Sequence, residues 1–124
     1  MKTLTLIPET GELDALVSRV VDADTVDVCL FVPLRVRLVG IQAAESNTVK
    51  GKLAAKTLAD RVTQQVVTLR LEGKDKYGRA LAKMRTADGR DMADWLIGLG
   101  LAVPWDGRGI RPAGQNAPGE DVVI

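Results

Sequence analysis

The sequence predicts an α+β protein, a small barrel of about five short strands with two packed helices. Short runs rich in Val, Leu, Ile and Thr recur along the chain, and the clearest, Leu34–Val39, alternates strictly between apolar and charged residues. Two other stretches, one after Thr48 and one from Met92, carry apolar residues at helical spacing. The chain has 124 residues, the size of one domain, and 46% of them are hydrophobic. We therefore expect one barrel with one core.

Six segments have the composition of strands. They are Leu4–Ile7, Ala15–Val21, Thr25–Phe31, Leu34–Val39, Val66–Leu71 and Ala80–Thr86. In Leu34–Val39 the apolar residues alternate with Arg35 and Arg37, so these two cations are expected to project together from one face.

Turn-forming residues separate the strands. Pro8–Gly11 is expected to close the first strand, and Asp22–Asp24 to make a tight connection before the third. Glu72–Arg79 is expected to be a charged connection that contains glycine. Asp88 and Gly89 form a strong turn signal after the last strand.

The first helix is expected to begin after Ser46, Asn47 or Thr48, each of which is an acceptable N-cap. Its apolar stripe is read as Leu53, Ala54, Leu58, Arg61 and Val62. The second helix has apolar residues at i, i+3, i+4 and i+7, namely Met92, Trp95, Leu96 and Leu99, and Gly100 is its expected left-handed cap. Short strands with a helix after the third main strand and a helix at the end describe a Greek-key barrel of the OB type.

We assign residues 1–106 to this domain and residues 107–124, which are rich in Gly and Pro, to an irregular tail. Only 3% of the residues are aromatic, so the core is expected to be aliphatic. The single cysteine, Cys29, is expected to be a small buried hydrophobe. No apolar run reaches membrane-spanning length, and the Met1–Pro8 start is too short and interrupted for a signal peptide. We expect a cytoplasmic protein, favour a monomer, and note that a trimmed secreted form would read the same.

The composition also restricts the chemistry. The chain has no histidine, which removes the usual catalytic triads, zinc sites and imidazole acid–base catalysis. Its net charge is +1, so contact with a nucleic acid would depend on a local cluster of basic residues. Any bound metal would be a hard cation held by oxygen ligands.

Three segments combine arginines with carboxylates: Asp22–Thr25, Arg37–Glu45 and Asp75–Arg79. Arginine binds phosphate with two parallel hydrogen bonds, and a carboxylate can hold a metal or activate water. Together these groups suit a phosphodiester. An isolated Arg-x-Arg strand would more often be a solvated face, but the other two segments favour a site.

In this order, the three segments resemble the staphylococcal nuclease family. The resemblance implies that Arg37, Glu45 and Arg79 are catalytic, with the arginines on the phosphate and Glu45 near the attacking water. It implies a calcium ion held by Asp24, by the residue at position 42 (here Gln42) and by the Ala43 carbonyl, with Asp22 outside them. Tyr77 and Lys76 would contact the nucleotide, although Tyr77 could equally pack over the Gly78 backbone.

The chain departs from the family pattern at Gln42, where the family has aspartate, and at Ala44, commonly proline. A neutral amide should weaken calcium binding. The expected function is a calcium-dependent endonuclease that hydrolyses DNA or RNA, single-stranded or frayed, with no membrane partner. The alternatives are an impaired nuclease-like module that binds single-stranded nucleic acid or a protein, and a scaffold whose site residues are remnants.

Overall fold

A computed structural model of the chain describes residues 10–30, 33–45 and 47–107. Strands and helices follow each other through this part of the chain as β1 (Thr10–Asp22), β2 (Thr25–Cys29), β3 (Pro33–Leu38), β4 (Ile41–Ala43), α1 (Val49–Val62), β5 (Val66–Lys74), β6 (Ala80–Arg85), α2 (Met92–Gly98) and β7 (Ala102–Pro104). The expected strand Leu4–Ile7 and the expected tail from residue 108 onward lie outside the described residues. Within the described part, no helix is both long enough and apolar enough to span a bilayer.

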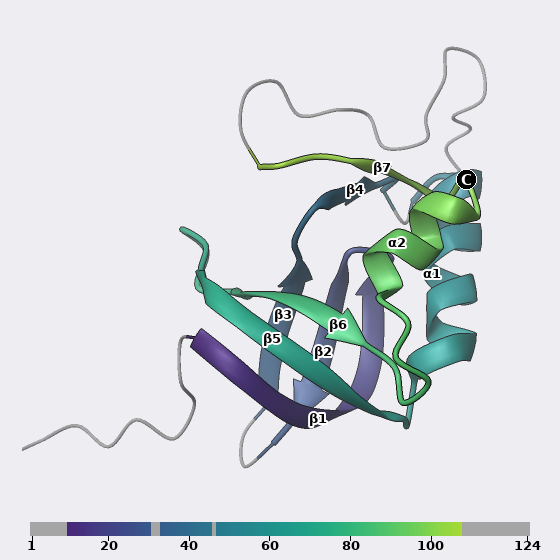
Figure 1. Cartoon of the computed structure of the whole chain (residues 1–124). Coiled ribbons are helices and arrows are strands. Elements are labelled where there is room, and N and C mark those ends of the chain that lie inside the picture. Colours follow the sequence, from purple (N-terminus) through teal and green to yellow (C-terminus); the bar gives the residue numbers. More distant parts are fainter. Residues whose placement is uncertain (1–9, 31–32, 46, 108–124) are drawn as a thin grey trace, which may run out of the picture.

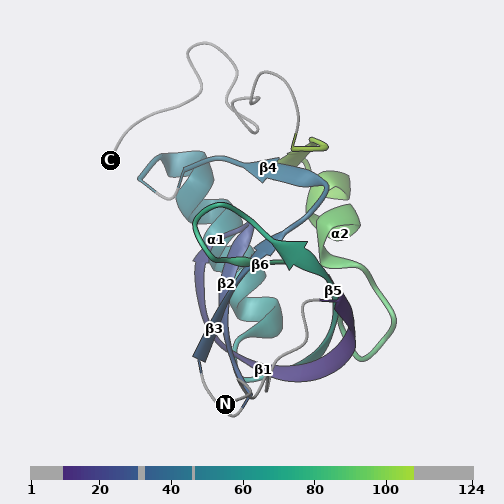
Figure 2. The ribbon, with the colours of Figure 1, turned by 90° about the vertical axis from the view of Figure 1, so that its left-hand side faces the viewer.

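Five strands close into a barrel in the order β1–β2–β3–β6–β5, and β5 pairs again with β1. All neighbours are antiparallel except β3 and β6, which run parallel and have β4, α1 and β5 between them in the chain. Figure 1 shows both helices on one side of the barrel and the small β4–β7 sheet beyond one end, and Figure 2 shows the barrel turned by 90°. The predicted five-stranded barrel with two helices is confirmed.

The 13-residue strand β1 makes closure possible because it serves two neighbours. Its first half, from Thr10 to Leu16, pairs with β5, and its second half, from Leu16 to Asp22, pairs with β2. Register shifts in the second half indicate bulges, which bend a strand and increase its twist. The prediction of a turn at Gly11 was wrong: Gly11 lies in β1 opposite Leu71, with φ +107°, a conformation that glycine tolerates.

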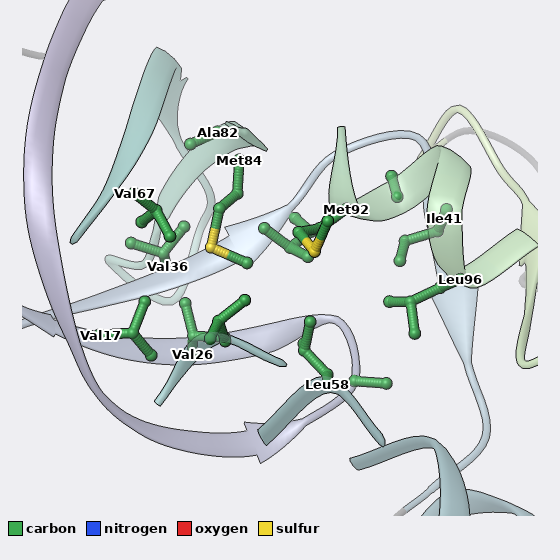
Figure 3. Packing of buried hydrophobic residues seen from close by; sticks show 14 of the residues in the cluster. Val17, Val26, Val36, Ile41, Leu58, Val67, Ala82, Met84, Met92 and Leu96 are labelled. Atoms are coloured by element: carbon green, nitrogen blue, oxygen red, sulfur yellow. The ribbon is translucent and has the colours of Figure 1, made fainter. Parts of the chain in front are cut away.

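The core is aliphatic, as expected. Valine, leucine, isoleucine, alanine and methionine side chains from the barrel, β4 and both helices fill it, and Figure 3 shows fourteen of them. The prediction for Cys29 was wrong, because this residue is exposed. Val26 and Val28 occupy the inward positions of β2, so the two-residue alternation of a strand turns Cys29 outward.

Helix α1 begins at the N-cap Thr48, whose hydroxyl accepts a hydrogen bond from the Gly51 N–H at 3.0 Å. It packs against β1 through a buried stripe that consists of Gly51, Ala54, Leu58 and Val62. Leu53, expected in this stripe, is 56% exposed. The buried residues follow the helical spacing i, i+3, i+7 and i+11 from Gly51, which leaves Leu53 and Arg61 outside the stripe.

Helix α2 begins at the N-cap Asp91 and buries Met92 and Leu96. Leu99 was expected on the same face but is exposed, because the helix ends at Gly98. Gly100 then takes the expected left-handed conformation, with φ +75°.

The sequence did not predict β4 or β7, which are three residues each and pair antiparallel with each other. Beyond β7, the Trp105 N–H donates to the Gly40 carbonyl at 2.9 Å. These contacts fasten the loop between β3 and β4, and with it residues 41–45, over one end of the barrel.

Candidate active site

A cleft of about 790 Å³ opens where the β1–β2 turn, the β3–β4 loop, the β5–β6 turn and the segment after β7 meet. Every residue that the sequence analysis placed in the site, except Ala43, lines this cleft: Asp22, Asp24, Arg37, Gln42, Glu45, Lys76, Tyr77 and Arg79. The parallel pairing of β3 with β6 explains part of this convergence. It sets Arg37 opposite Leu81, so the two arginine-bearing segments, around Arg37 and Arg79, lie on neighbouring strands.

Asp24 lies in the two-residue turn between β1 and β2 and is 5% exposed. Its carboxylate is held from two sides. One oxygen accepts a hydrogen bond from the Thr25 hydroxyl at 3.1 Å, and the other accepts from the Ala43 N–H at 2.9 Å. The turn is therefore tied directly to β4.

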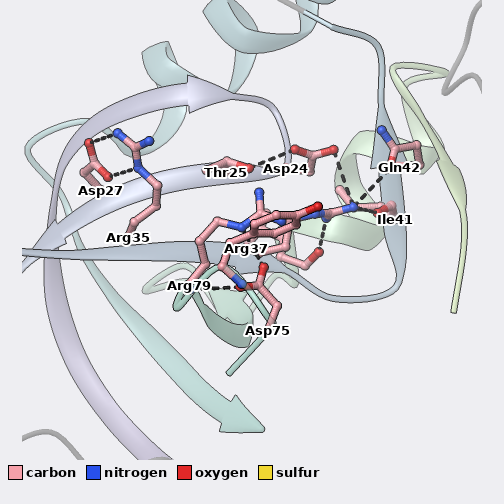
Figure 4. A network of polar contacts seen from close by, with 11 residues as sticks. Asp24, Thr25, Asp27, Arg35, Arg37, Ile41, Gln42, Asp75 and Arg79 are labelled. Atoms are coloured by element: carbon pink, nitrogen blue, oxygen red, sulfur yellow. Dashed lines mark hydrogen bonds and ion pairs between the residues drawn. The ribbon is translucent and has the colours of Figure 1, made fainter. Parts of the chain in front are cut away.

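Arg37 is buried at the floor of the cleft, with 9% of its surface exposed. Its guanidinium donates to the carbonyl oxygens of Leu38 and of Ile41, the latter at 2.9 Å, and lies 3.7 Å from the second carboxylate oxygen of Asp24. Figure 4 shows this network separately from the pair that Arg35 makes with Asp27 at 2.8 Å.

The two arginines of β3, which were expected to project together from one face, differ in their surroundings. Arg35 stays exposed on the barrel wall, whereas the β3–β4 loop folds over Arg37 and supplies its carbonyl acceptors. Arg37 thus orders the loop as well as facing the cleft.

Gln42, 3% exposed, bridges Arg37 and the backbone of β4. Its side-chain oxygen accepts from the Arg37 guanidinium at 3.1 Å, and its side-chain nitrogen donates to the Ala43 carbonyl at 3.0 Å. Both atoms that the resemblance assigns to a metal at these two positions therefore face protein groups.

Glu45 follows β4 and exposes its side chain at the cleft. Its backbone is held by the start of α1, because the Glu45 carbonyl accepts hydrogen bonds from the Thr48 hydroxyl at 2.8 Å and from the Thr48 N–H at 3.1 Å. Because Gly51 has no side chain, the first turn of α1 can lie against the Glu45 carbonyl. A Cβ at residue 51 would lie only 1.6 Å from this carbonyl oxygen. This role of Gly51 was not predicted from the sequence, where its only signal is a glycine in the first turn of a helix.

Asp75 organises the turn that carries Arg79. Its carboxylate accepts from the N–H groups of Tyr77 and Arg79, each at 2.9 Å, and from the Arg79 guanidinium at 2.6 Å. This aspartate begins the segment Asp75–Arg79, but its role was not predicted from the sequence. Its signal was available, since Asp commonly accepts from the backbone two residues ahead in a turn that ends in glycine.

Partial burial alone would raise the pKa of the Asp75 carboxyl. The hydrogen bonds from Arg79 and Tyr77, with the charge of the Arg79 guanidinium, outweigh burial and hold this pKa below its ordinary value. The negative charge that positions Arg79 is therefore retained well into acid.

The rim of the cleft is aromatic and basic. The Tyr77 ring is 71% exposed, with Lys76 Nζ 5.2 Å from its centroid and the Arg79 guanidinium carbon 5.4 Å from it. Trp105, which follows Pro104 at the end of β7, also lines the cleft.

The donor set does not fit a tightly bound calcium ion, which takes about six to eight oxygen ligands. Asp24 offers a carboxylate, but the Gln42 and Ala43 oxygens already accept hydrogen bonds from protein donors. Within residues 10–30, 33–45 and 47–107, no three Asp, Glu or Cys side chains form a group able to hold a metal ion.

Comparison with known proteins gives the family. Residues 35–112, more than half of the chain, match the family model described as Staphylococcal nuclease homologue. Protein ParB of Escherichia coli is 40% identical over 75 residues, which are 60% of this chain and 42% of that protein. Micrococcal nuclease of Shigella flexneri is 37% identical over 76 residues (60% and 44%), and an uncharacterized endonuclease of Escherichia coli O157:H7 is 29% identical over 93 residues (74% and 61%).

The chain thus spans between about two fifths and three fifths of the length of these relatives. The matched family region contains most of β3 and all of β4, α1, β5, β6, α2 and β7. The chain belongs to the staphylococcal nuclease family.

Proposed function

We propose that this chain is a nuclease that hydrolyses phosphodiester bonds in single-stranded or frayed DNA or RNA. One observation carries the proposal: two arginines and an exposed glutamate, brought from the separate segments Arg37–Glu45 and Asp75–Arg79, line the same cleft. The names of two relatives, an endonuclease and a micrococcal nuclease, agree with it.

In the proposed reaction, a phosphodiester enters the cleft between Arg37 and Arg79. Both guanidinium groups would stabilise the negative charge that grows on the phosphoryl oxygens, and such preorganised donors often provide the largest catalytic effect. Their positions are held by neighbouring groups, Arg37 by backbone carbonyls and Arg79 by Asp75, so little reorganisation is required. Glu45 would take a proton from the attacking water, because its carboxylate is exposed at the cleft.

Two features support a single-stranded or frayed substrate. The floor residues Asp24 and Arg37 are buried, so a phosphate must enter the cleft to approach them. The exposed Tyr77 ring with Lys76 beside it forms a rim where an unpaired base can stack while its backbone passes a cation.

Calcium enters this proposal as a weakly held ion. When bound, it would supply electrostatic stabilisation of phosphate oxygens, with Asp24 as its main protein ligand and Asp22 at the same cleft. The arrangement of Gln42 and Ala43 is the reason that we expect the binding to be weak.

The test is cleavage of labelled single-stranded DNA and RNA, in calcium and in chelator, by the natural chain and by Glu45→Gln. A nuclease should cleave, and the amide variant should lose about 10²–10⁴-fold in turnover because the general base is gone. Glu72→Gln is the matched control, because it makes the same change from carboxylate to amide on β5, outside the cleft. Equal activity in Glu45→Gln and Glu72→Gln would refute the assignment of Glu45.

A second candidate is a module that binds a nucleic-acid strand in this cleft without cutting it. The hydrogen bonds of the Arg37 guanidinium to Ile41 and Gln42 favour it, because these donors are engaged with protein acceptors before a substrate arrives. Retention of the strand without cleavage, in calcium and in chelator alike, would select this candidate over the enzyme.

A further inference from the structure

The buried amide of Gln42 joins the two halves of the cleft. It lies in β4 opposite Val103 of β7, and its two polar atoms connect the Arg37 guanidinium to the Ala43 carbonyl. Ala43 in turn donates its N–H to Asp24. A closed set of contacts therefore runs from Arg37 through Gln42 and Ala43 to Asp24, and back to Arg37 across 3.7 Å.

The orientation of this amide is dictated by its neighbours. A guanidinium has only donors, so the group facing Arg37 must be the amide oxygen. The amide nitrogen then faces the Ala43 carbonyl, which has only acceptor capacity. A rotated amide would place donor against donor at Arg37 and oxygen against oxygen at Ala43, losing both hydrogen bonds.

This orientation works against a cation at the Ala43 carbonyl. An ion there would meet the amide hydrogens that already bind that oxygen. The charges lead to the same result, because Asp24 is balanced by Arg37 and Gln42 is neutral. The formal charges of Asp24, Arg37 and Gln42 therefore sum to zero. An aspartate at position 42 would instead leave one net negative charge for a cation to neutralise.

We propose that the Gln42 amide takes the structural place of a bound cation, so that this cleft binds the phosphate groups of nucleotides without calcium. The inference rests on the proposed function for its ligand class, the phosphate mono- and diesters of nucleotides. Substrate binding then requires no metal, because the amide keeps Arg37, β4 and the Asp24 turn in place, and Arg37 and Arg79 hold the phosphate.

The test is calorimetry with a deoxynucleoside 3′,5′-bisphosphate, in chelator and in millimolar calcium. The natural chain should bind in chelator, and millimolar calcium should tighten the binding by no more than about threefold, because a weakly held ion occupies only part of the sites at that concentration. Gln42→Asp should bind weakly in chelator and at least about tenfold more tightly in calcium, because its carboxylate repels phosphate until an ion bridges them. Arg35→Ala, on the barrel wall outside the cleft, should behave as the natural chain does.

A third variant, Gln42→Leu, distinguishes the effect of the amide hydrogen bonds from the effect of side-chain size. It removes both hydrogen bonds without adding a metal ligand, so its affinity should fall in both solutions and calcium should not restore it. Thermal melting of each variant identifies any that fails to fold, and the result for the natural chain does not depend on them.

The outcomes are distinguishable. If the natural chain binds the bisphosphate only in calcium, the inference is overturned and the proposed nuclease stands. If it binds in neither solution, both are overturned. Calcium-independent binding together with calcium-dependent binding by Gln42→Asp would establish the role of the amide.

Discussion

Gly51→Ala is the substitution for which the sequence and the structure predict opposite results. Alanine is the best helix former, and replacing glycine inside a helix normally stabilises it by about 1 kcal/mol. In this chain, a Cβ on residue 51 would lie 1.6 Å from the Glu45 carbonyl oxygen and 2.9 Å from the Thr48 hydroxyl. The question is which effect prevails.

The size of the clash at residue 51 allows the change in the free energy of unfolding to be estimated. Real Cβ contacts essentially never fall below 3.0 Å, so Glu45 or the first turn of α1 must move by about 1.4 Å to relieve the clash. Such overpacking costs about 1–3 kcal/mol, and the move breaks the two hydrogen bonds from Thr48 to Glu45, each worth about 1 kcal/mol. After the gain in helix propensity, we expect a net loss of about 2–4 kcal/mol.

The same shift should impair catalysis. A 1 Å misplacement of a catalytic group can reduce turnover about 10²-fold, and Glu45 is the group displaced. Urea unfolding measures the stability, and cleavage of a labelled oligonucleotide measures turnover at a temperature where every variant is folded. Thr48→Ala, which removes the hydroxyl contact and the N-cap without a clash, should cost about 1 kcal/mol and leave more activity.

Gly98→Ala in α2 is the matched control. Among the described residues, no heavy atom other than those of the adjacent residues and the helix's own backbone lies within 4 Å of a Cβ at this position, so the substitution should be neutral or stabilise by up to about 1 kcal/mol. If Gly51→Ala were as stable and as active as Gly98→Ala, the close approach of α1 to Glu45 would be refuted, and with it the account of how Glu45 is positioned.

Three further predictions concern the cleft. Arg37→Ala and Arg79→Ala should each reduce cleavage by about 10²–10³-fold, whereas Arg35→Ala should have little effect; equal losses at Arg35 and Arg37 would reduce the site to a basic patch. Calcium should bind the natural chain at about millimolar affinity and more tightly after Gln42→Asp, and equal calorimetric affinities would remove residue 42 from the metal site. Because the folded pKa of Asp75 is lowered, its carboxylate stabilises the fold above the unfolded pKa of about 3.9, and this contribution is lost as pH falls through the lower folded value. Asp75→Asn should therefore reduce stability at neutral pH and show a shallower loss in acid, and parallel urea-midpoint profiles against pH would contradict this.

The barrel could be predicted because most of its strands and turns are determined by residues that are close together in the sequence. Alternation in Leu34–Val39 and the turn at Asp22–Asp24 each follow from neighbours in sequence. The strands β4 and β7 could not be predicted, because three residues carry no period and their pairing joins segments about sixty residues apart. The burial of Arg37 could not be predicted for the same reason. It depends on the carbonyl groups of a loop that lies over Arg37 only through tertiary packing.

The site residues were predictable through motif order, but their mutual arrangement was not. A sequence shows that Gln42 is neutral, and it does not show that both ends of the amide are engaged. Similarly, Asp75 was visible as a turn residue, whereas its three contacts that fix Arg79 required the structure.

The pairing of both arginines with carboxylates leads to the last prediction, which concerns salt. Arg37 lies 3.7 Å from Asp24, and Arg79 lies 2.6 Å from Asp75, so neither adds much net positive charge to the cleft. Affinity for a strand should then come mainly from directed hydrogen bonds. For single strands the slope of log K against log salt is about −0.7 per phosphate neutralised, so contacts by Arg37, Arg79 and Lys76 give a slope no steeper than about −2.

Filter binding of a short single strand by Glu45→Gln, over a range of salt concentrations in chelator, measures this slope without cleavage. A slope near −1 to −2 would place the strand in the cleft alone. A slope of about −4 or steeper would require further basic side chains, and the lysines of α1, Lys50, Lys52 and Lys56, are the first to replace. That result would refute the cleft as the whole binding surface, because net charge over a broad face, rather than the paired arginines, would then hold the nucleic acid.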